Sequence, residues 1–193
     1  FRSQLLAGLD NYLVKRHRAW NEMNISNVFK GEITRKIVDF LIEIGIPVVS
    51  SSIDGETFLP GILVENGRLL VDESKLLYPG DLLHEAGHLA LADSGLRESL
   101  SGEVAFPGVI MEPVESQAIA WSYAAALHIE LDPTVVFHEN GYQGNASGLL
   151  FNFQLGAYIG VNGLQAAGLT ALGEQATMLG CRPYPSMNKW IRD

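Results

Sequence analysis

The chain has 193 residues, of which 47% are hydrophobic, so it is long enough to bury a core and fits one domain. Its formal net charge is −9, and its 13 lysines and arginines are scattered or gathered in the short run Lys15–Arg18, which argues against a surface that binds DNA or RNA directly. The one cysteine, Cys181, excludes an internal disulfide framework and favours a reducing, cytoplasmic compartment.

Two amphipathic helices are predicted at the start of the chain. Apolar residues recur at helical spacing within residues 5–13 and again from Ile33 to Ile44, where Gly45 is a natural helix C-cap. The composition then changes to β-branched residues in Ile46–Ile53, and two apolar runs flank Asn66-Gly67, a dipeptide typical of tight hairpins. A small antiparallel sheet is therefore expected after the helices.

The segment Pro79–Gly95 is predicted to form a helix that carries two histidines. Pro79-Gly80 interrupts the sheet, Asp81 can cap the following helix, and the sequence LLHEAGHLALAD continues to Gly95. In a chain with 5 histidines, random placement of residues would produce a His-Glu-x-x-His arrangement only roughly 0.01 times. Chance placement therefore does not explain this pattern.

The remaining chain is predicted to be mostly helical. Residues 94–108 are expected to form a loop, and Pro113 can occupy the first turn of a long helix that Pro133 closes. A short helix is predicted near residues 134–140. Residues 141–173 carry no charged side chain, but asparagines, glutamines and glycines interrupt this stretch, so a pair of buried helices is expected there and no membrane span.

The spacing of His84 and His88 suits a metal ion. On a helix, residues i and i+4 lie on one face about 6 Å apart, so both imidazoles can bind one cation at about 2.0–2.1 Å. Glu85 projects about 100° around the same turn, where it can take a proton from a metal-activated water without ligating the metal itself. A catalytic zinc also needs a third protein ligand and one open position.

Glu112 and Glu115, near the start of the long helix, are the candidates for the third ligand. Glu112 precedes Pro113, which disfavours helical geometry at that position, whereas Glu115 falls inside the first helical turn. Because a ligand must be held rigidly, Glu115 is the predicted one. Two histidines and one glutamate leave zinc with one net positive charge, enough to activate water and polarise a carbonyl. His138 and Tyr142 are candidate oxyanion stabilisers on residue type alone.

Several of these features together resemble the ImmA/IrrE family of zinc metallopeptidases. They are the sequence IGIPV, the hairpin, the sequence LLHEAGHLAL, and Glu115, which lies 27 residues after His88 and is followed by small and aromatic residues. The resemblance covers Ile33 to Leu131, about half of the chain. It implies a gluzincin-like α+β fold with His84, His88 and Glu115 as zinc ligands and Glu85 as general base. Some members of that family cleave transcriptional repressors.

The expected fold class is α+β and zincin-like, mostly helical, with the small antiparallel sheet beside the helix that carries the two histidines. One metallopeptidase-like domain is predicted over residues 1–193, with a catalytic core at 26–131 and a helical C-terminal extension at 132–193. The family resemblance stops at the end of the core. In addition, Ser116-Gln117 follow Glu115, where members of the family typically have Ala-Asn.

The predicted function is zinc-dependent hydrolysis of a peptide or protein substrate, which the resemblance suggests is a regulatory protein. The hairpin edge is a candidate for aligning an extended substrate by strand addition. Two alternatives remain open from the residues. One is a metal-binding sensor or interaction module without turnover, and the other is a zinc hydrolase of small non-peptide substrates. An intact Glu85 favours an enzyme, because a site without turnover has no need of a base.

Overall fold

The computed structural model describes residues 26–102 and 111–193, so the predicted helix at residues 5–13 and the basic run Lys15–Arg18 lie outside the described residues. The described part is a mixed α/β fold with seven α-helices, three short 3-10 helices and one small sheet. Its elements, in chain order, are η1 (Ser26–Val28), α2 (Glu32–Glu43), β1 (Val48–Ser50), β2 (Ile62–Glu65), β3 (Arg68–Val71), α3 (Asp81–Leu91), α4 (Ser94–Arg97), α5 (Met111–His128), η2 (Pro133–Val135), η3 (Tyr142–Gly144), α6 (Ala146–Gln154), α7 (Val161–Ala166) and α8 (Gly173–Leu179).

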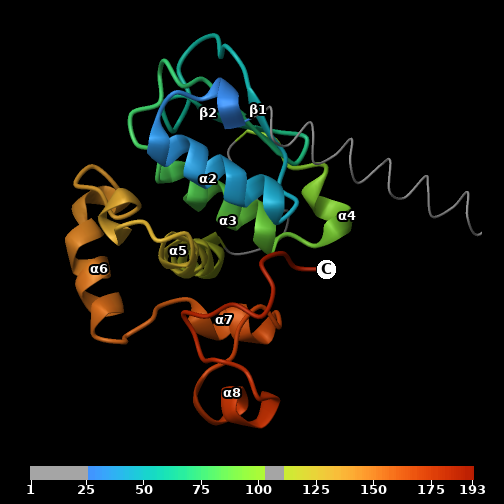
Figure 1. The fold of residues 1–193 in the computed structure, drawn as a ribbon, viewed down its shortest axis with the longest axis vertical. Coiled ribbons are helices and arrows are strands. Elements are labelled where there is room, and N and C mark those ends of the chain that lie inside the picture. Colours follow the sequence, from blue (N-terminus) through green and yellow to red (C-terminus); the bar gives the residue numbers. More distant parts are fainter. Residues whose placement is uncertain (1–25, 103–110) are drawn as a thin grey trace, which may run out of the picture.

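Helix α5 occupies the middle of the molecule. Figure 1 shows it nearly end-on, with α2 and α3 on one side, α6 on another and α7 on a third. Contacts join α3 to α5, α5 to α7, and α2 to α3. Most of the α5 side chains are accordingly buried, including Trp121, whose indole N–H donates to the Trp190 carbonyl oxygen at 2.9 Å. The helix is thus enclosed by chain segments from both before and after it.

Helix α2 confirms the second predicted helix and its end. It buries Val38 and Leu41 in the core, whereas Ile33, expected on the same apolar face, is 39% exposed. Gly45 adopts a φ of 93°, a left-handed conformation that favours glycine. The Gly45 N–H donates to the Ile42 carbonyl and the Ile46 N–H to the Leu41 carbonyl. This pair of bonds is a Schellman motif, which satisfies the last carbonyls of the helix.

The sheet is mixed, and the prediction of an antiparallel sheet is wrong for β1. The hairpin of β2 and β3 forms as expected around Asn66-Gly67, both of which have positive φ. However, β1 pairs in parallel with β3, with Val48 opposite Leu69, so the strand order is β1-β3-β2. The hairpin pattern specifies only its own two strands. A third strand of three residues carries no local signal for its direction.

The helix that carries the histidines is shorter than predicted. It begins at Asp81, which was expected to be the cap ahead of the first turn, and ends at Leu91, because Ala92 adopts an extended conformation. The segment predicted as a loop over residues 94–108 contains the short helix α4, and its residues 103–108 lie outside the described part of the chain. The Arg97 guanidinium donates to the carbonyl oxygens of Leu89 and Ala92 at 2.8 and 2.7 Å. A cation at this position complements the carbonyl end of α3.

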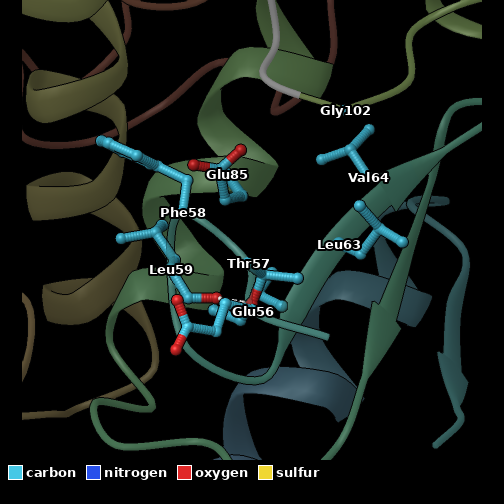
Figure 2. Close-up of a pocket in the computed structure, with 9 residues that line it drawn as sticks. Glu56, Thr57, Phe58, Leu59, Leu63, Val64, Glu85 and Gly102 are labelled. Carbon is cyan, nitrogen blue, oxygen red and sulfur yellow. Dashed lines mark hydrogen bonds between the residues drawn. The ribbon is translucent and has the colours of Figure 1, made fainter. Parts of the chain in front are cut away.

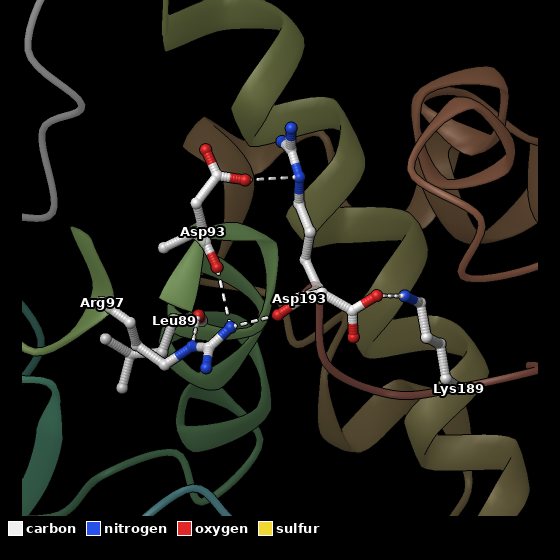
Figure 3. Close-up of polar contacts among 7 residues, drawn as sticks. Leu89, Asp93, Arg97, Lys189 and Asp193 are labelled. Atoms are coloured by element: carbon white, nitrogen blue, oxygen red, sulfur yellow. Dashed lines mark hydrogen bonds and ion pairs between the residues drawn. The ribbon is translucent and has the colours of Figure 1, made fainter. Parts of the chain in front are cut away.

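Figure 3 shows that the last residues of the sequence are bound to the same end of α3. The Arg97 guanidinium also donates to the Arg192 carbonyl at 2.6 Å, and the Arg192 Nε forms an ion pair with Asp93 at 2.8 Å. Lys189 and Asp193 pair at 2.6 Å. Because the Arg192 N–H also donates to the Ala90 carbonyl, backbone and side-chain bonds together fix the C-terminal segment against α3.

The segment after α5 is helical, but the prediction of two buried helices is only half right. Helices α6 and α7 form within residues 141–173, and α7 buries Val161 and Leu164. Of the α6 residues, only Ala146 and Phe153 are buried, while Phe151 is 59% exposed. The absence of charged residues from this stretch therefore did not predict which helix faces are buried. No helix in residues 26–102 and 111–193 combines the length and apolar character needed to span a bilayer.

Candidate metal centre

His84 and His88 lie one turn apart on α3, and Glu115 approaches them from α5. The two Nε2 atoms are 3.2 Å apart. Glu115 Oε2 lies 3.4 Å from His84 Nε2, and Glu115 Oε1 lies 3.3 Å from His88 Nε2. The structure therefore brings together the three predicted metal ligands, with the Glu115 carboxylate presenting a different oxygen to each imidazole.

These distances can be compared with those of a tetrahedral zinc site. Nitrogen and oxygen ligands at about 2.0–2.1 Å in a tetrahedron are separated from one another by roughly 3.3–3.4 Å. The separation of 3.2 Å between the two Nε2 atoms, and those of 3.4 and 3.3 Å from each Nε2 to its own Glu115 oxygen, are close to that edge. Two imidazoles and one carboxylate are also a donor set that catalytic zinc uses. The residues present therefore fit a zinc ion with three protein ligands and one open position.

The alternative ligand Glu112 is not tested by this geometry. Its backbone belongs to α5, contrary to the expectation that Pro113 would keep it out of the helix, while its side chain lies outside the described part of the structure. A proline near the start of a helix is tolerated because the first four N–H groups have no partner within the helix in any case. The helix can therefore start ahead of Pro113.

A pair of small residues allows α3 and α5 to approach closely enough for this contact. A Cβ atom on Gly87 would lie 3.2 Å from the Ala118 Cα and 3.3 Å from the Ala118 Cβ. Gly87 stands beside His88 in sequence, and Ala118 follows Glu115 by one helical turn. The two helices therefore make this close contact next to the candidate ligands. Gly87 was not predicted to have this function, although its place inside HEAGH offered a signal.

The imidazoles hold the Glu115 carboxylate in its ionised form. Hydrogen bonds, first from His84 and then from His88, hold the pKa of Glu115 well below its usual range, against a smaller opposing effect of burial. His88 is buried, whereas the Glu115 side chain is 46% exposed. The site thus has a buried floor on α3 and an open side at α5, as a centre that admits a substrate requires.

The second nitrogens of the two rings have no protein partner in the described ranges. The Nδ1 atoms of both His84 and His88 are buried, and no hydrogen bond to either is formed within residues 26–102 and 111–193. In zinc sites this N–H usually donates to a carboxylate, a carbonyl or water, and so fixes the ring tautomer. The Nε2 atoms, which contact Glu115, are therefore the ones suited to a metal. No protein group of residues 26–102 and 111–193 bonds to the Nδ1 atoms and so fixes the tautomers of the two rings.

Glu85, next to His84 on α3, lines a second cavity. A carboxylate oxygen of Glu85 and one nitrogen from each of His84 and His88 all lie within 4.8 Å of one another. Figure 2 shows Glu85 on α3 facing a pocket, with Phe58 on one side and Val64 on the other. The predicted base is thus close to the imidazoles, on the wall of a different cavity from the one lined by His84 and Glu115.

His138 forms a partly buried pair with Asp81, and the prediction that Asp81 caps α3 is wrong. Asp81 is the first residue of the helix and makes no capping hydrogen bond. Instead, its Oδ1 lies 2.9 Å from His138 Nε2, and the His138 ring stacks on Tyr78 with centroids 3.7 Å apart. Burial raises the pKa of Asp81, and the hydrogen bond with His138 partly opposes this rise. Sequence reasoning could not find this pair, because 57 residues separate its members.

The Tyr142 ring contacts the His84 ring edge-to-face, with ring centroids 5.7 Å apart. Burial, reinforced by the nearby charges of Asp81 and Glu115, raises the pKa of Tyr142 above its ordinary value, so the phenol keeps its proton. Tyr142, His138, His84 and Glu115 all line one cavity of about 470 Å³. The structure therefore places both predicted oxyanion stabilisers at the cavity lined by His84 and Glu115, two of the three candidate ligands.

No family model, curated protein or solved structure matches this chain. The resemblance to the ImmA/IrrE family therefore stays a prediction from the motif and its spacing.

Proposed function

We propose that this protein is a zinc-dependent metallopeptidase of the ImmA/IrrE type that hydrolyses peptide bonds. The observation that supports the proposal best is the convergence of His84, His88 and Glu115, in which the two Nε2 atoms lie 3.2 Å apart and each lies 3.3–3.4 Å from an oxygen of the Glu115 carboxylate. Two histidines four residues apart on one helix face come together by local geometry. The carboxylate that meets both of them comes from a separate helix, and two imidazoles with one carboxylate are a donor set that catalytic zinc uses.

The protein's own residues divide the chemistry among them. His84, His88 and Glu115 would hold the ion, which when bound lowers the pKa of water and polarises the carbonyl of the scissile bond. A Glu85 carboxylate oxygen lies within 4.8 Å of one ring nitrogen of each histidine, close enough for Glu85 to accept a proton from the attacking water. It then passes the proton to the leaving nitrogen.

Tyr142 is better placed than His138 to stabilise the oxyanion. Its phenol keeps its proton, so it can donate a hydrogen bond to developing negative charge. His138 already uses Nε2 in the bond to Asp81, and its Nδ1 is buried. We therefore assign His138 and Asp81 the role of fixing the wall of the cavity, with Tyr142 as the donor.

The test combines metal analysis with hydrolysis. The zinc content of the purified chain is measured after reconstitution, and a library of peptides and denatured proteins is offered with and without a chelator. We expect Glu85→Gln to keep zinc and lose at least about 100-fold in rate, the contribution typical of a general base. Glu43→Gln, an exposed carboxylate on α2, is the matched control and should retain the parent rate.

The possible results separate the competing functions. Zinc binding without hydrolysis of any peptide or small ester would favour a sensor or interaction module. Hydrolysis of small esters alone would favour a non-peptide hydrolase. A Glu85→Gln variant as active as the parent would show that Glu85 is not the base. Absence of zinc affinity in the folded chain would overturn the proposal as a whole.

A further inference from the structure

A small cavity adjoins Glu85, between the α3 helix and the edge of the sheet. It has a volume of about 210 Å³ and is walled mainly by Phe58, Leu59, Ile62 and Val64, with Glu85 on α3 above them. We name it the Glu85 pocket, after the residue that faces the proposed reaction. An apolar cavity of about 150 Å³ is enough to hold a benzene molecule. The Glu85 pocket is therefore large enough for one leucine or phenylalanine side chain.

About half of the outward backbone hydrogen-bonding groups of strand β2 already have partners within the chain. Strand β2 is at the edge of the sheet. The Gly61 carbonyl accepts from the Asp72 N–H, just after β3, so the alternate residues Ile62 and Val64 are the ones whose backbone groups point outward. The Ile62 N–H donates to the Leu59 carbonyl at 3.1 Å, and the Val64 carbonyl accepts from Gly102 N–H at 2.8 Å. Each of these residues thus has one outward group engaged. An added strand could not form complete residue pairs here, so a substrate must be recognised largely through its side chains.

Phe58 stands between the Glu85 pocket and the cavity that contains His84 and Glu115. It lines both cavities, and its side chain is 80% exposed. Exposing a phenylalanine to this extent leaves most of its apolar surface in water, which contact with a bound apolar group would remove. Leu77 is also highly exposed, at 65%, but is not among the residues of either cavity. Phe58 therefore differs from Leu77 in that it lines both cavities.

We propose that the Glu85 pocket is a specificity pocket, which receives an apolar side chain at one of the two positions flanking the scissile bond of a peptide, with Phe58 as its exposed wall. This inference rests on the proposed peptidase function, since it names the substrate class of the same site. The charges at the pocket agree with an apolar occupant. Glu56 and Glu85 both line it, so an acidic side chain meets like charge, whereas an apolar one meets the four hydrophobic walls.

The test uses the zinc-loaded chain and peptides that vary at both flanking positions. At one of them, leucine or phenylalanine should give a kcat/KM at least about tenfold higher than aspartate. Phe58→Ala should lower kcat/KM for the leucine peptide about tenfold, mainly through KM, and change that for an alanine peptide less than about twofold. Leu77→Ala is the matched control, because it removes an exposed apolar side chain of similar size away from both cavities.

A charge reversal gives an independent measurement. Glu56→Lys should raise kcat/KM for the aspartate peptide relative to the leucine peptide, since the like charge becomes an opposite one. Asp54→Lys makes the same change in net charge two residues away, outside the pocket lining, and should leave the ratio unchanged. Equal rates for leucine and aspartate at both positions, or equal effects of Phe58→Ala and Leu77→Ala, would overturn the specificity pocket while leaving the peptidase intact.

Failure of the peptidase itself is distinguishable from failure of the pocket. If the zinc-loaded chain hydrolyses no peptide, binding of fluorescein-labelled leucine and aspartate peptides to the metal-free chain decides the matter. Tighter binding of the leucine peptide, lost in Phe58→Ala and kept in Leu77→Ala, would support the pocket without catalysis. Equal binding of both peptides would overturn it.

Discussion

Replacing Glu115 with alanine should remove the carboxylate that contacts both imidazoles and leave the two histidines in place. His84 and His88 are spaced by α3 alone, so their separation of 3.2 Å does not depend on α5. Glu115 supplies both remaining contacts, at 3.4 and 3.3 Å, one through each carboxylate oxygen. The variant therefore tests whether the contact between the helices contributes a ligand or is only an ion pair.

The expected loss can be bounded from the geometry. Removing a group that only orients a ligand costs about 10–100-fold in metal affinity. Removing a ligand should cost more, and we expect about 1,000-fold, or about 4 kcal/mol at 1.4 kcal/mol per factor of ten. Glu115→Gln should lose nearly as much, since the amide cannot supply the negative charge that offsets zinc.

Zinc affinity is measured by competition with a chromophoric chelator, with circular dichroism to show that α5 remains helical. Glu112→Ala is the matched variant, because it removes the other candidate carboxylate from the start of the same helix. Its loss should not exceed about tenfold to a hundredfold, the range for orientation of a ligand. A larger loss for Glu112→Ala than for Glu115→Ala would refute the assignment of the third ligand.

Three further predictions concern the helices and the pH dependence of binding. Gly45→Ala should lower the free energy of unfolding by about 1 kcal/mol, because φ is positive there, whereas Gly95→Ala should cause no loss in the same denaturant titration. Gly87→Ala should weaken zinc binding about tenfold without lowering helix content, because its Cβ would press on Ala118 at 3.2–3.3 Å; unchanged affinity would contradict this. Zinc occupancy should fall as pH is lowered, because imidazole ligands must be neutral and the two histidines take up protons. The depressed pKa of Glu115 keeps its carboxylate ionised over this range. An occupancy that stays flat down to about pH 4, below the ordinary imidazole pKa, would contradict the ligand assignment.

The parts of this fold that follow from local chemistry were predictable from the sequence. Gly45 ends α2 because a left-handed residue satisfies the last helical carbonyls, and Asn66-Gly67 closes the hairpin because both residues tolerate positive φ. The pairing of His84 with His88 is equally local, since a helix fixes the spacing of residues four apart. Each of these features depends on fewer than ten consecutive residues.

Features that depend on distant segments were not predictable in this way. The direction of β1 is set by how the chain returns to β3, and nothing within its three residues specifies it. Asp81 has the residue type of an N-cap, yet it is the first residue of the helix and its carboxylate bonds to His138, which lies 57 residues away. Its residue type favours a capping role, but tertiary packing brings a partly buried histidine into contact with its carboxylate instead.

The C-terminal extension adds a dependence of the proposed centre on residues far from the motif. A Cβ atom on Gly160, at the start of α7, would lie 1.9 Å from the carbonyl oxygen of Ser116, and one on Gly163 would meet the Gln117 side chain. Ser116 and Gln117 directly follow Glu115 on α5, and they are the two residues that differ from the pattern of the resembled family. Because α7 packs this closely on the turn that carries Glu115, the extension limits the freedom of that turn. The position of the third ligand is therefore set from both sides, by Gly87 on α3 and by Gly160 ahead of α7.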